Sequence, residues 1–256
     1  MVCHLGAKPA GAAAPVKGGD VIEVQWTPWP ASHKGPVLDY LANCNGPCET
    51  VDKTKLKFFK IGEAGWIDKA SDLWAANVLA NNNNSWFVRI PEDIAPGNYV
   101  LRHEIIALHA AGNPNGAQSY PFCFNLAIDS KGTANPAGIP VTEFYKANDP
   151  GIKFDLFSHP TAYVIPGVSR IRNFFPCFSI ISSPLRRIEA KTFYSRLFTA
   201  VRSLSARRSP ALLLPRLLVF MRILRPRISE HQSCRHRHRC PSYQLHWHFR
   251  QELHPQ

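Results

Sequence analysis

Two histidines, a tyrosine and a glutamine are among the residues of this sequence whose side chains could take part in chemistry. His33 lies in the loop Ser32-His33-Lys34-Gly35-Pro36, and His109 follows a long apolar stretch. Gln118 and Tyr120 are two residues apart, so their side chains share one face if the segment is a strand. Imidazole nitrogens are common ligands of first-row transition metals. Taken singly, each residue also has an ordinary alternative, as a loop histidine or as a buried tyrosine with a satisfied hydroxyl.

Alternating apolar and polar residues predict the strands that must position these groups. We expect strands at residues 21–26, 55–61, 86–90, 99–109, 122–128 and 164–165, and a short helix near 74–79. Turn signals at short spacing, without a long amphipathic helix, favour an all-β fold, an antiparallel β-sandwich. His103 and His109 share one face of the strand 99–109. His103 is expected to be a polar position beside the sheet, whereas His109 falls at the strand end, where side chains can join a loop-built site.

The formal net charge of +12 is confined to the last third of the chain. Residues 1–167 contain 13 Lys and Arg against 15 Asp and Glu, whereas residues 168–256 contain 17 against 3. All 15 glycines lie at or before Gly167, and a folded domain normally uses several for turns. We therefore predict a folded domain at 1–167 and a basic tail at 168–256 that is disordered or comes from a non-native reading frame. A functional nucleic-acid tail around residues 235–239 is the alternative.

The sequence shows neither the pattern of a membrane span nor that of a signal peptide. No stretch reaches the roughly 20 apolar residues of a membrane span. The start, Met1-Val2-Cys3-His4-Leu5, lacks the pattern of a signal peptide. We expect no membrane partner and no nucleic-acid partner.

Several segments in a fixed order resemble one family of fungal enzymes. The matching segments are residues 26–30, 32–37, 39–42, 95–109, 116–123, 145–151 and 163–167. Together they are similar to the lytic polysaccharide monooxygenases of auxiliary activity family nine, formerly glycoside hydrolase family sixty-one. The resemblance covers nearly all of residues 1–167 and none of the tail. It implies an immunoglobulin-like or fibronectin type III-like β-sandwich with a flat substrate face.

The resemblance also implies a copper site and its residues. In this family the copper binds the amine and imidazole of an N-terminal histidine, a second imidazole and an axial tyrosine oxygen. His33 matches the second imidazole and Tyr120 the axial tyrosine, while His109 and Gln118 match the pair that hydrogen-bonds the oxygen species. Tyr163 resembles an aromatic residue that stacks on a glucan.

One part of the family pattern is not found. Residue 1 is Met, and the backbone nitrogen of His4 is an amide that cannot act as an amine ligand. We expect a domain truncated at its N-terminus, with weak copper binding and little or no oxidative cleavage.

Four cysteines fit the family's disulfides. By resemblance, Cys44 pairs with Cys48 in a short loop, and Cys3 pairs with Cys123 over a long range. Disulfides belong to oxidising compartments, so an extracellular origin is expected although the chain shows no signal peptide.

Two functions follow from these observations. The first is copper-dependent oxidative cleavage of β-1,4-glucan such as cellulose by a monomer that uses an external electron donor. The alternative is a non-catalytic glucan-binding β-sandwich without a working metal centre. Hydrolysis is disfavoured because no pair of carboxylates stands out as a glycosidase requires.

Overall fold

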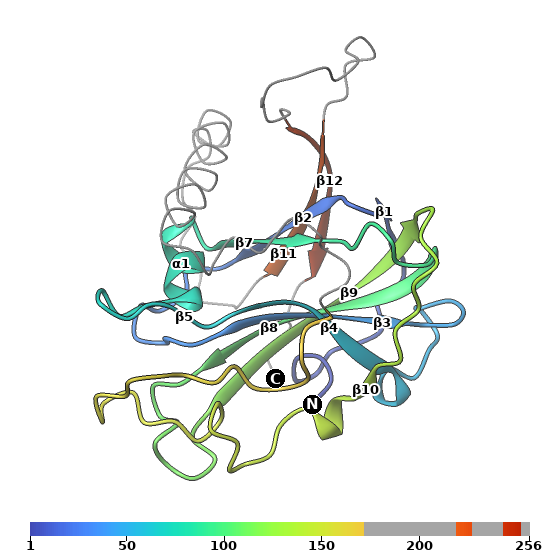
Figure 1. Ribbon diagram of the computed structural model, residues 1–256. Coiled ribbons are helices and arrows are strands. Elements are labelled where there is room, and N and C mark those ends of the chain that lie inside the picture. The colour runs from blue at the N-terminus through green and yellow to red at the C-terminus, as the bar shows by residue number, and fades with distance from the viewer. Residues whose placement is uncertain (172–218, 227–242, 252–256) are drawn as a thin grey trace. The chain divides into compact units, whose positions relative to one another are not determined.

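The computed structural model describes residues 1–171, 219–226 and 243–251. Figure 1 shows a six-stranded sheet with the strands β2 and β7 of a second sheet lying over it. In spatial order, the larger sheet contains β1 (Ala14–Lys17), β9 (Gln118–Asp129), β8 (Gly97–Ala107), β3 (Val37–Asn43), β4 (Lys57–Ala64) and β10 (Ile139–Pro140). The second contains β12 (Tyr243–Gln251), β11 (Val219–Pro226), β2 (Val21–Trp26) and β7 (Ser85–Arg89). A small ribbon joins β5 (Trp66–Asp68) to β6 (Leu73–Trp74), and α1 (Ala75–Asn81) follows it.

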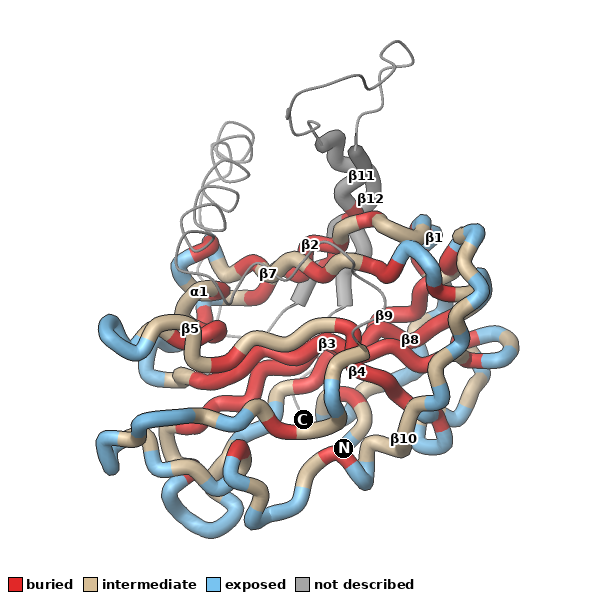
Figure 2. The backbone as a smooth tube through the Cα atoms, viewed as in Figure 1, coloured by how far each residue is buried: buried red, intermediate tan, exposed pale blue. Residues whose placement is uncertain are grey.

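The core lies between the two sheets, as the predicted sandwich requires. Ile22, Val24 and Trp26 of β2 are buried, and so are most of the apolar residues of β3, β8 and β9 (Figure 2). Burying apolar area on facing sheets is the main driving force for this fold. The all-β sandwich expected from the sequence is therefore confirmed.

Five of the six expected strands form, and the structure has further strands that were not expected. Strands β2, β4, β7, β8 and β9 overlap the predicted segments, although β8 ends at Ala107 and leaves His109 in the turn that follows, and α1 forms near the expected helix. Strand β3 was not expected, because Val37–Asn43 is buried at six of its seven positions and has no clear alternation. Residues 164–165 do not form a strand; the Val164 carbonyl instead lies close to Gly151.

One strand pair departs from the antiparallel expectation. Strand β1 pairs with β9 in parallel, with Ala14 opposite Leu126 and Lys17 opposite Asp129. The segment before β1 is attached to β9 by the disulfide between Cys3 and Cys123. The chain between β1 and β9 passes through strands of both sheets, and this supplies the long connection that a parallel pair requires.

Two segments of the basic tail form strands where we expected disorder. Strand β11 pairs with β2 over six residues, from Val219 opposite Trp26 to Leu224 opposite Val21, and β12 pairs with β11. Met221 and Ile223 are both 2% exposed, so alternate apolar residues of β11 are buried as in a regular strand. An open β2 edge offers unpaired backbone groups, which explains why this apolar segment can add to it. Residues 172–218, 227–242 and 252–256 of the tail, which include 235–239, lie outside the described residues.

Candidate functional site

The loop that carries His33 is held tightly against the end of β8. The Leu108 amide donates to the Lys34 carbonyl at 2.8 Å, and the Ala76 amide donates to the Gly35 carbonyl at 3.1 Å. A Cβ atom on Gly35 would lie 1.8 Å from the Ile106 carbonyl oxygen, so only glycine allows this approach. The loop therefore brings His33 to the turn that follows β8, where His109 lies.

The two imidazoles face each other in this turn. The ring centroids of His33 and His109 are 4.0 Å apart with an interplanar angle of 30°. His33 Nδ1 is 3.1 Å from the Ser32 hydroxyl. Burial, and secondarily the nearby His109, lowers the pKa of His33, so its imidazole is neutral at pH 7. A neutral imidazole is the form that binds metals.

His109 has one unusual feature. Its Nδ1 atom is buried and has no hydrogen-bond partner among the described residues. Buried polar atoms are normally paired, so an unpaired ring nitrogen at a cluster of this kind suggests a function.

Gln118 and Tyr120 lie at the start of β9, and their side chains share one face of the strand. Tyr120 lies opposite Ile105, and Gln118 lies opposite Ala107 at the end of β8. The Tyr120 hydroxyl donates to the Gln118 Oε1 atom at 2.6 Å. Burial raises the pKa of Tyr120, so the phenol is protonated at neutral pH.

Trp29 joins these two groups of residues. Its ring stands edge-on to His33 at 5.8 Å and edge-on to Tyr120 at 5.1 Å. The structure thus places His33 beside His109 and Tyr120 beside Gln118, with Trp29 in contact with one member of each pair. It adds Trp29, which lay in a matching segment but carried no predicted role.

Tyr163 has a different environment from these residues. Its hydroxyl donates to the Gly151 carbonyl at 2.8 Å, and its ring is edge-on to Trp74 and Phe154. Burial raises the pKa of Tyr163 above its usual value. The ring is half-buried, so stacking on a glucan stays a prediction.

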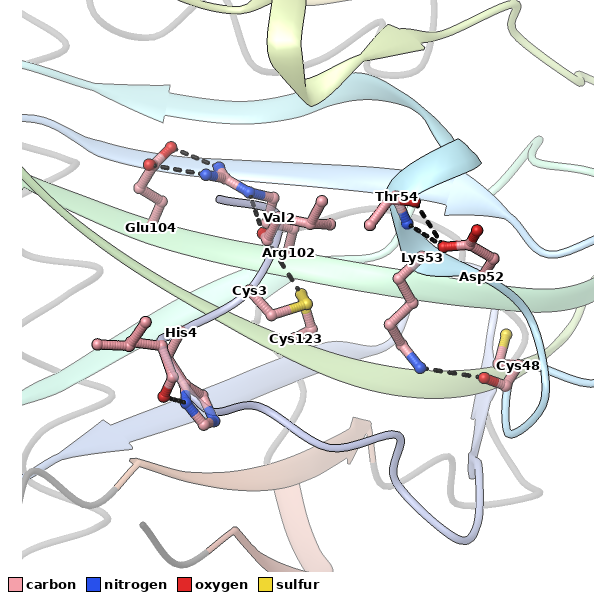
Figure 3. The surroundings of a disulfide bond; sticks show 11 residues. Val2, Cys3, His4, Cys48, Asp52, Lys53, Thr54, Arg102, Glu104 and Cys123 are labelled. Atoms are coloured by element: carbon pink, nitrogen blue, oxygen red, sulfur yellow. Dashed lines mark hydrogen bonds and ion pairs between the residues drawn. A yellow bond between two sulfur atoms is a disulfide. The ribbon is translucent and has the colours of Figure 1, made fainter. Parts of the chain in front are cut away.

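Both expected disulfides are present. Cys3 is bonded to Cys123, and Cys44 is bonded to Cys48. Figure 3 shows the long-range disulfide beside Val2, whose carbonyl accepts a hydrogen bond from Arg102 Nε at 2.7 Å. The N-terminal segment is therefore attached to the sheet by a covalent bond and a polar contact.

A buried ion pair lies on β8, and no sequence pattern predicted it. Arg102 contacts both carboxylate oxygens of Glu104 at 2.5 and 2.8 Å, and the two side chains are at most 1% exposed. Ser119 and Tyr145 also donate to Glu104. Burial opposes ionisation, but Arg102 and these hydrogen bonds together hold the pKa of Glu104 below its usual value.

His103 is not beside the sheet as expected but fully buried between the two sheets. Trp26 Nε1 donates to its Nε2 atom at 3.0 Å, and its Nδ1 atom is 2.7 Å from Asp39 Oδ1. Trp86 Nε1 donates to the other Asp39 oxygen at 3.2 Å. Both ring nitrogens of His103 are hydrogen-bonded, as buried polar atoms normally are, and these bonds link β2 of one sheet to β3 of the other.

Fold and cluster together define a β-sandwich protein with an imidazole–phenol site at the ends of its strands. Residues 1–163 match the family model for Auxiliary Activity family 9 (formerly GH61). The chain therefore belongs to this family.

Individual relatives agree with the family. Over 170 residues the chain is 63% identical to AA9 family lytic polysaccharide monooxygenase I of Botryotinia fuckeliana, covering 65% of this chain and 63% of the relative. It is 60% identical over 169 residues to AA9 family lytic polysaccharide monooxygenase A of Malbranchea cinnamomea, covering 65% of this chain and 51% of the relative. The chain thus spans between half and two thirds of the length of these two relatives.

Among solved structures, the extended catalytic domain of Hypocrea jecorina LPMO9A superposes with a TM-score of 0.65 at 52% identity. The match covers 68% of this chain and 70% of that chain. Among the residues that the structure describes here, no helix is long and apolar enough to cross a membrane.

Proposed function

We propose that this chain contains the sandwich part of a copper-dependent lytic polysaccharide monooxygenase that cleaves β-1,4-glucan by oxidation. The observation that carries the proposal is that Trp29 contacts both His33, which lies against His109, and Tyr120, which is hydrogen-bonded to Gln118. Family membership supports the reaction class.

The residues present fit copper in type but supply few ligands. A neutral imidazole and a phenol are suitable nitrogen and oxygen donors. The unpaired buried Nδ1 atom of His109 fits a site whose hydrogen bonding is incomplete without a bound group. However, no three His, Cys, Asp or Glu residues gather as a metal site in the described part of the chain. We therefore expect His33 and Tyr120 to hold copper only weakly in this chain.

The other residues of the site would orient the reactants. Copper would supply the one-electron chemistry that activates oxygen or peroxide, with electrons from an external donor. Because Gln118 Oε1 accepts the Tyr120 hydroxyl, its amide NH₂ group can donate toward a reacting oxygen. His109, held at the turn next to His33, would provide a second donor. Donors aimed in advance at developing charge are an effective form of catalysis.

The substrate proposed is cellulose or a related β-glucan. Aromatic rings bind the apolar faces of sugars, and Tyr163 is the candidate for this contact. The two disulfides support an extracellular location, where such bonds persist. The near-neutral charge of residues 1–167 does not favour nucleic acid. We propose that the protein acts as a monomer without a membrane partner.

A second candidate function is glucan binding without catalysis. The small number of metal ligands among the described residues favours it. Cellulose binding in the presence of a chelator, without oxidised products when copper and a reductant are added, would support this alternative.

Calorimetric copper titration and a cellulose oxidation assay test the proposal. Two matched variants, His33→Asn and His159→Asn, each remove one imidazole, and His159 is exposed and distant in sequence from the cluster. We expect weak copper binding that His33→Asn abolishes and His159→Asn retains. Equal binding by all three proteins would exclude His33 as a ligand. Tight stoichiometric binding with abundant oxidised products would contradict the expected weakness.

A further inference from the structure

One asparagine fixes both ends of the segment that carries Trp29. Asn84 lies in the turn between α1 and β7 and has a left-handed backbone with φ of 57°. Its carbonyl accepts the Trp26 amide at 2.8 Å, and its side-chain Oδ1 accepts the Trp29 amide at 2.8 Å. Asparagine suits this position because it tolerates the left-handed conformation and also provides a side-chain acceptor.

The Trp29 ring is in turn fixed against both candidate ligands. It is only 6% exposed, and its Nε1 atom donates to the His33 carbonyl at 3.0 Å. The same ring is edge-on to His33 and to Tyr120, with an interplanar angle of 88° in each case. Trp26 packs edge-on against its other side at 5.4 Å. The indole therefore contacts the His33 backbone, the His33 ring and the Tyr120 ring at once.

We propose that Asn84 and Trp29 are positioning residues that fix the separation of His33 from Tyr120 before any metal binds. His33 comes from a loop and Tyr120 from β9, so their relative position depends on a group that contacts both. The Asn84 side chain fixes the Trp29 backbone, and the Trp29 indole transmits that position to the two rings. A site arranged in advance loses less conformational freedom on binding. The part of this inference that concerns metal affinity rests on the proposed function.

Glycine and aspartate at position 84 separate the side-chain contact from the backbone requirement. Asn84→Gly accepts the left-handed conformation but removes Oδ1, whereas Asn84→Asp keeps an acceptor oxygen. The matched control is Asn83→Gly, because Asn83 is left-handed with φ of 50° but exposed. Melting curves of all variants, produced in an oxidising compartment, establish that each is folded.

The first measurement uses metal-free protein. Nuclear Overhauser contacts between the ring protons of Trp29 and Tyr120 should weaken or vanish in Asn84→Gly, and persist in Asn84→Asp and Asn83→Gly. Trp29→Phe, which keeps an aromatic ring but loses the bond to the His33 carbonyl, should weaken the contact between residue 29 and His33. Unchanged ring contacts in a folded Asn84→Gly would overturn the inference.

The second measurement is the copper(II) affinity and electron paramagnetic resonance spectrum of the same proteins. Asn84→Gly should weaken binding about five-fold, the equivalent of one hydrogen bond of about 1 kcal/mol, and broaden the spectrum. Asn84→Asp should restore both. If wild-type protein binds no copper while the ring contacts change as expected, the positioning inference stands and the proposed function fails. An affinity and spectrum unchanged by Asn84→Gly would contradict the inference.

Discussion

Removing the Cys3–Cys123 disulfide should destabilise this protein far more than removing the Cys44–Cys48 disulfide. The cysteines of the first are 120 residues apart and those of the second only 4 apart. Of the four disulfide-bonded cysteines, three are under 8% exposed and Cys3 is 8% exposed, so alanine is a suitable replacement in both pairs. The two double variants therefore differ mainly in the length of chain that the bond closes.

The magnitude follows from the loop-closure entropy of the unfolded chain. With the chain-entropy relation, the long loop contributes ~5 kcal/mol to the free energy of unfolding and the short loop ~2 kcal/mol at 25 °C. Domains of this kind have a total stability of about 5–15 kcal/mol. Cys3→Ala/Cys123→Ala should therefore lie near the threshold of unfolding, whereas Cys44→Ala/Cys48→Ala should remain folded.

Guanidinium unfolding followed by tryptophan fluorescence measures both changes, with equal denaturant slopes as the condition for comparing them. Hydrogen exchange provides a second measurement. In the long-range variant the amides of β1 should lose protection, because β1 runs along β9 from the point where Cys3 is attached. Equal losses of stability in the two double variants would refute the loop-entropy argument. Full protection of β1 would refute the proposed role of the bond in holding the N-terminal segment.

Three further changes have defined outcomes. Gly35→Ala places a Cβ atom 1.8 Å from the Ile106 carbonyl oxygen, so it should lower the free energy of unfolding by about 1–3 kcal/mol in thermal or denaturant unfolding. It should also weaken the nuclear Overhauser contact between the imidazoles of His33 and His109. A variant with wild-type stability and an unchanged contact would contradict the close-approach argument. Glu104→Gln leaves the Arg102 charge buried without its partner and should cost about 3–5 kcal/mol by calorimetry. Because the pKa of Glu104 is lowered in the folded state, its ionisation stabilises the wild-type protein at pH values above its usual pKa near 4.5. This contribution is lost as the pH falls through the lower pKa of the folded state. Glu104→Gln should therefore lack this loss of stability in acid, and a pH profile identical to that of wild type would argue against the role of Glu104. Met221→Ala should cost about 2–5 kcal/mol if β11 is a packed strand, and an unchanged unfolding midpoint would show that it is not.

Local sequence patterns predicted the strands with a clear period. Val21–Trp26 alternates apolar and polar residues, and it forms β2 with the expected bounds. Strand β3 lacked that signal because it lies in the middle of the larger sheet, between β8 and β4, and is buried on both faces. The parallel β1–β9 pair could not be predicted from local pattern either, because it joins residues far apart in the sequence, such as Ala14 and Leu126.

The candidate site shows the same division. The spacing of Gln118 and Tyr120 predicted a shared strand face, and the structure has both on β9 with a hydrogen bond between them. The contact of His33 with His109 could not be derived from spacing, since it depends on how closely the Gly35 loop approaches Ile106. The contacts of Trp29 with His33 and Tyr120 could not be predicted from the sequence for the same reason.

By itself the sequence determined the types of chemical groups present, the sandwich class and the boundary in composition near Gly167. These properties depend on residue type and on neighbours within a few positions, which the chain displays directly. Only the tertiary structure decided that Trp29 stands between His33 and Tyr120, that His103 is buried with both ring nitrogens bonded, and that part of the tail pairs with β2. These are contacts between distant residues, and their geometry is set by the packing of the two sheets and not by any local preference.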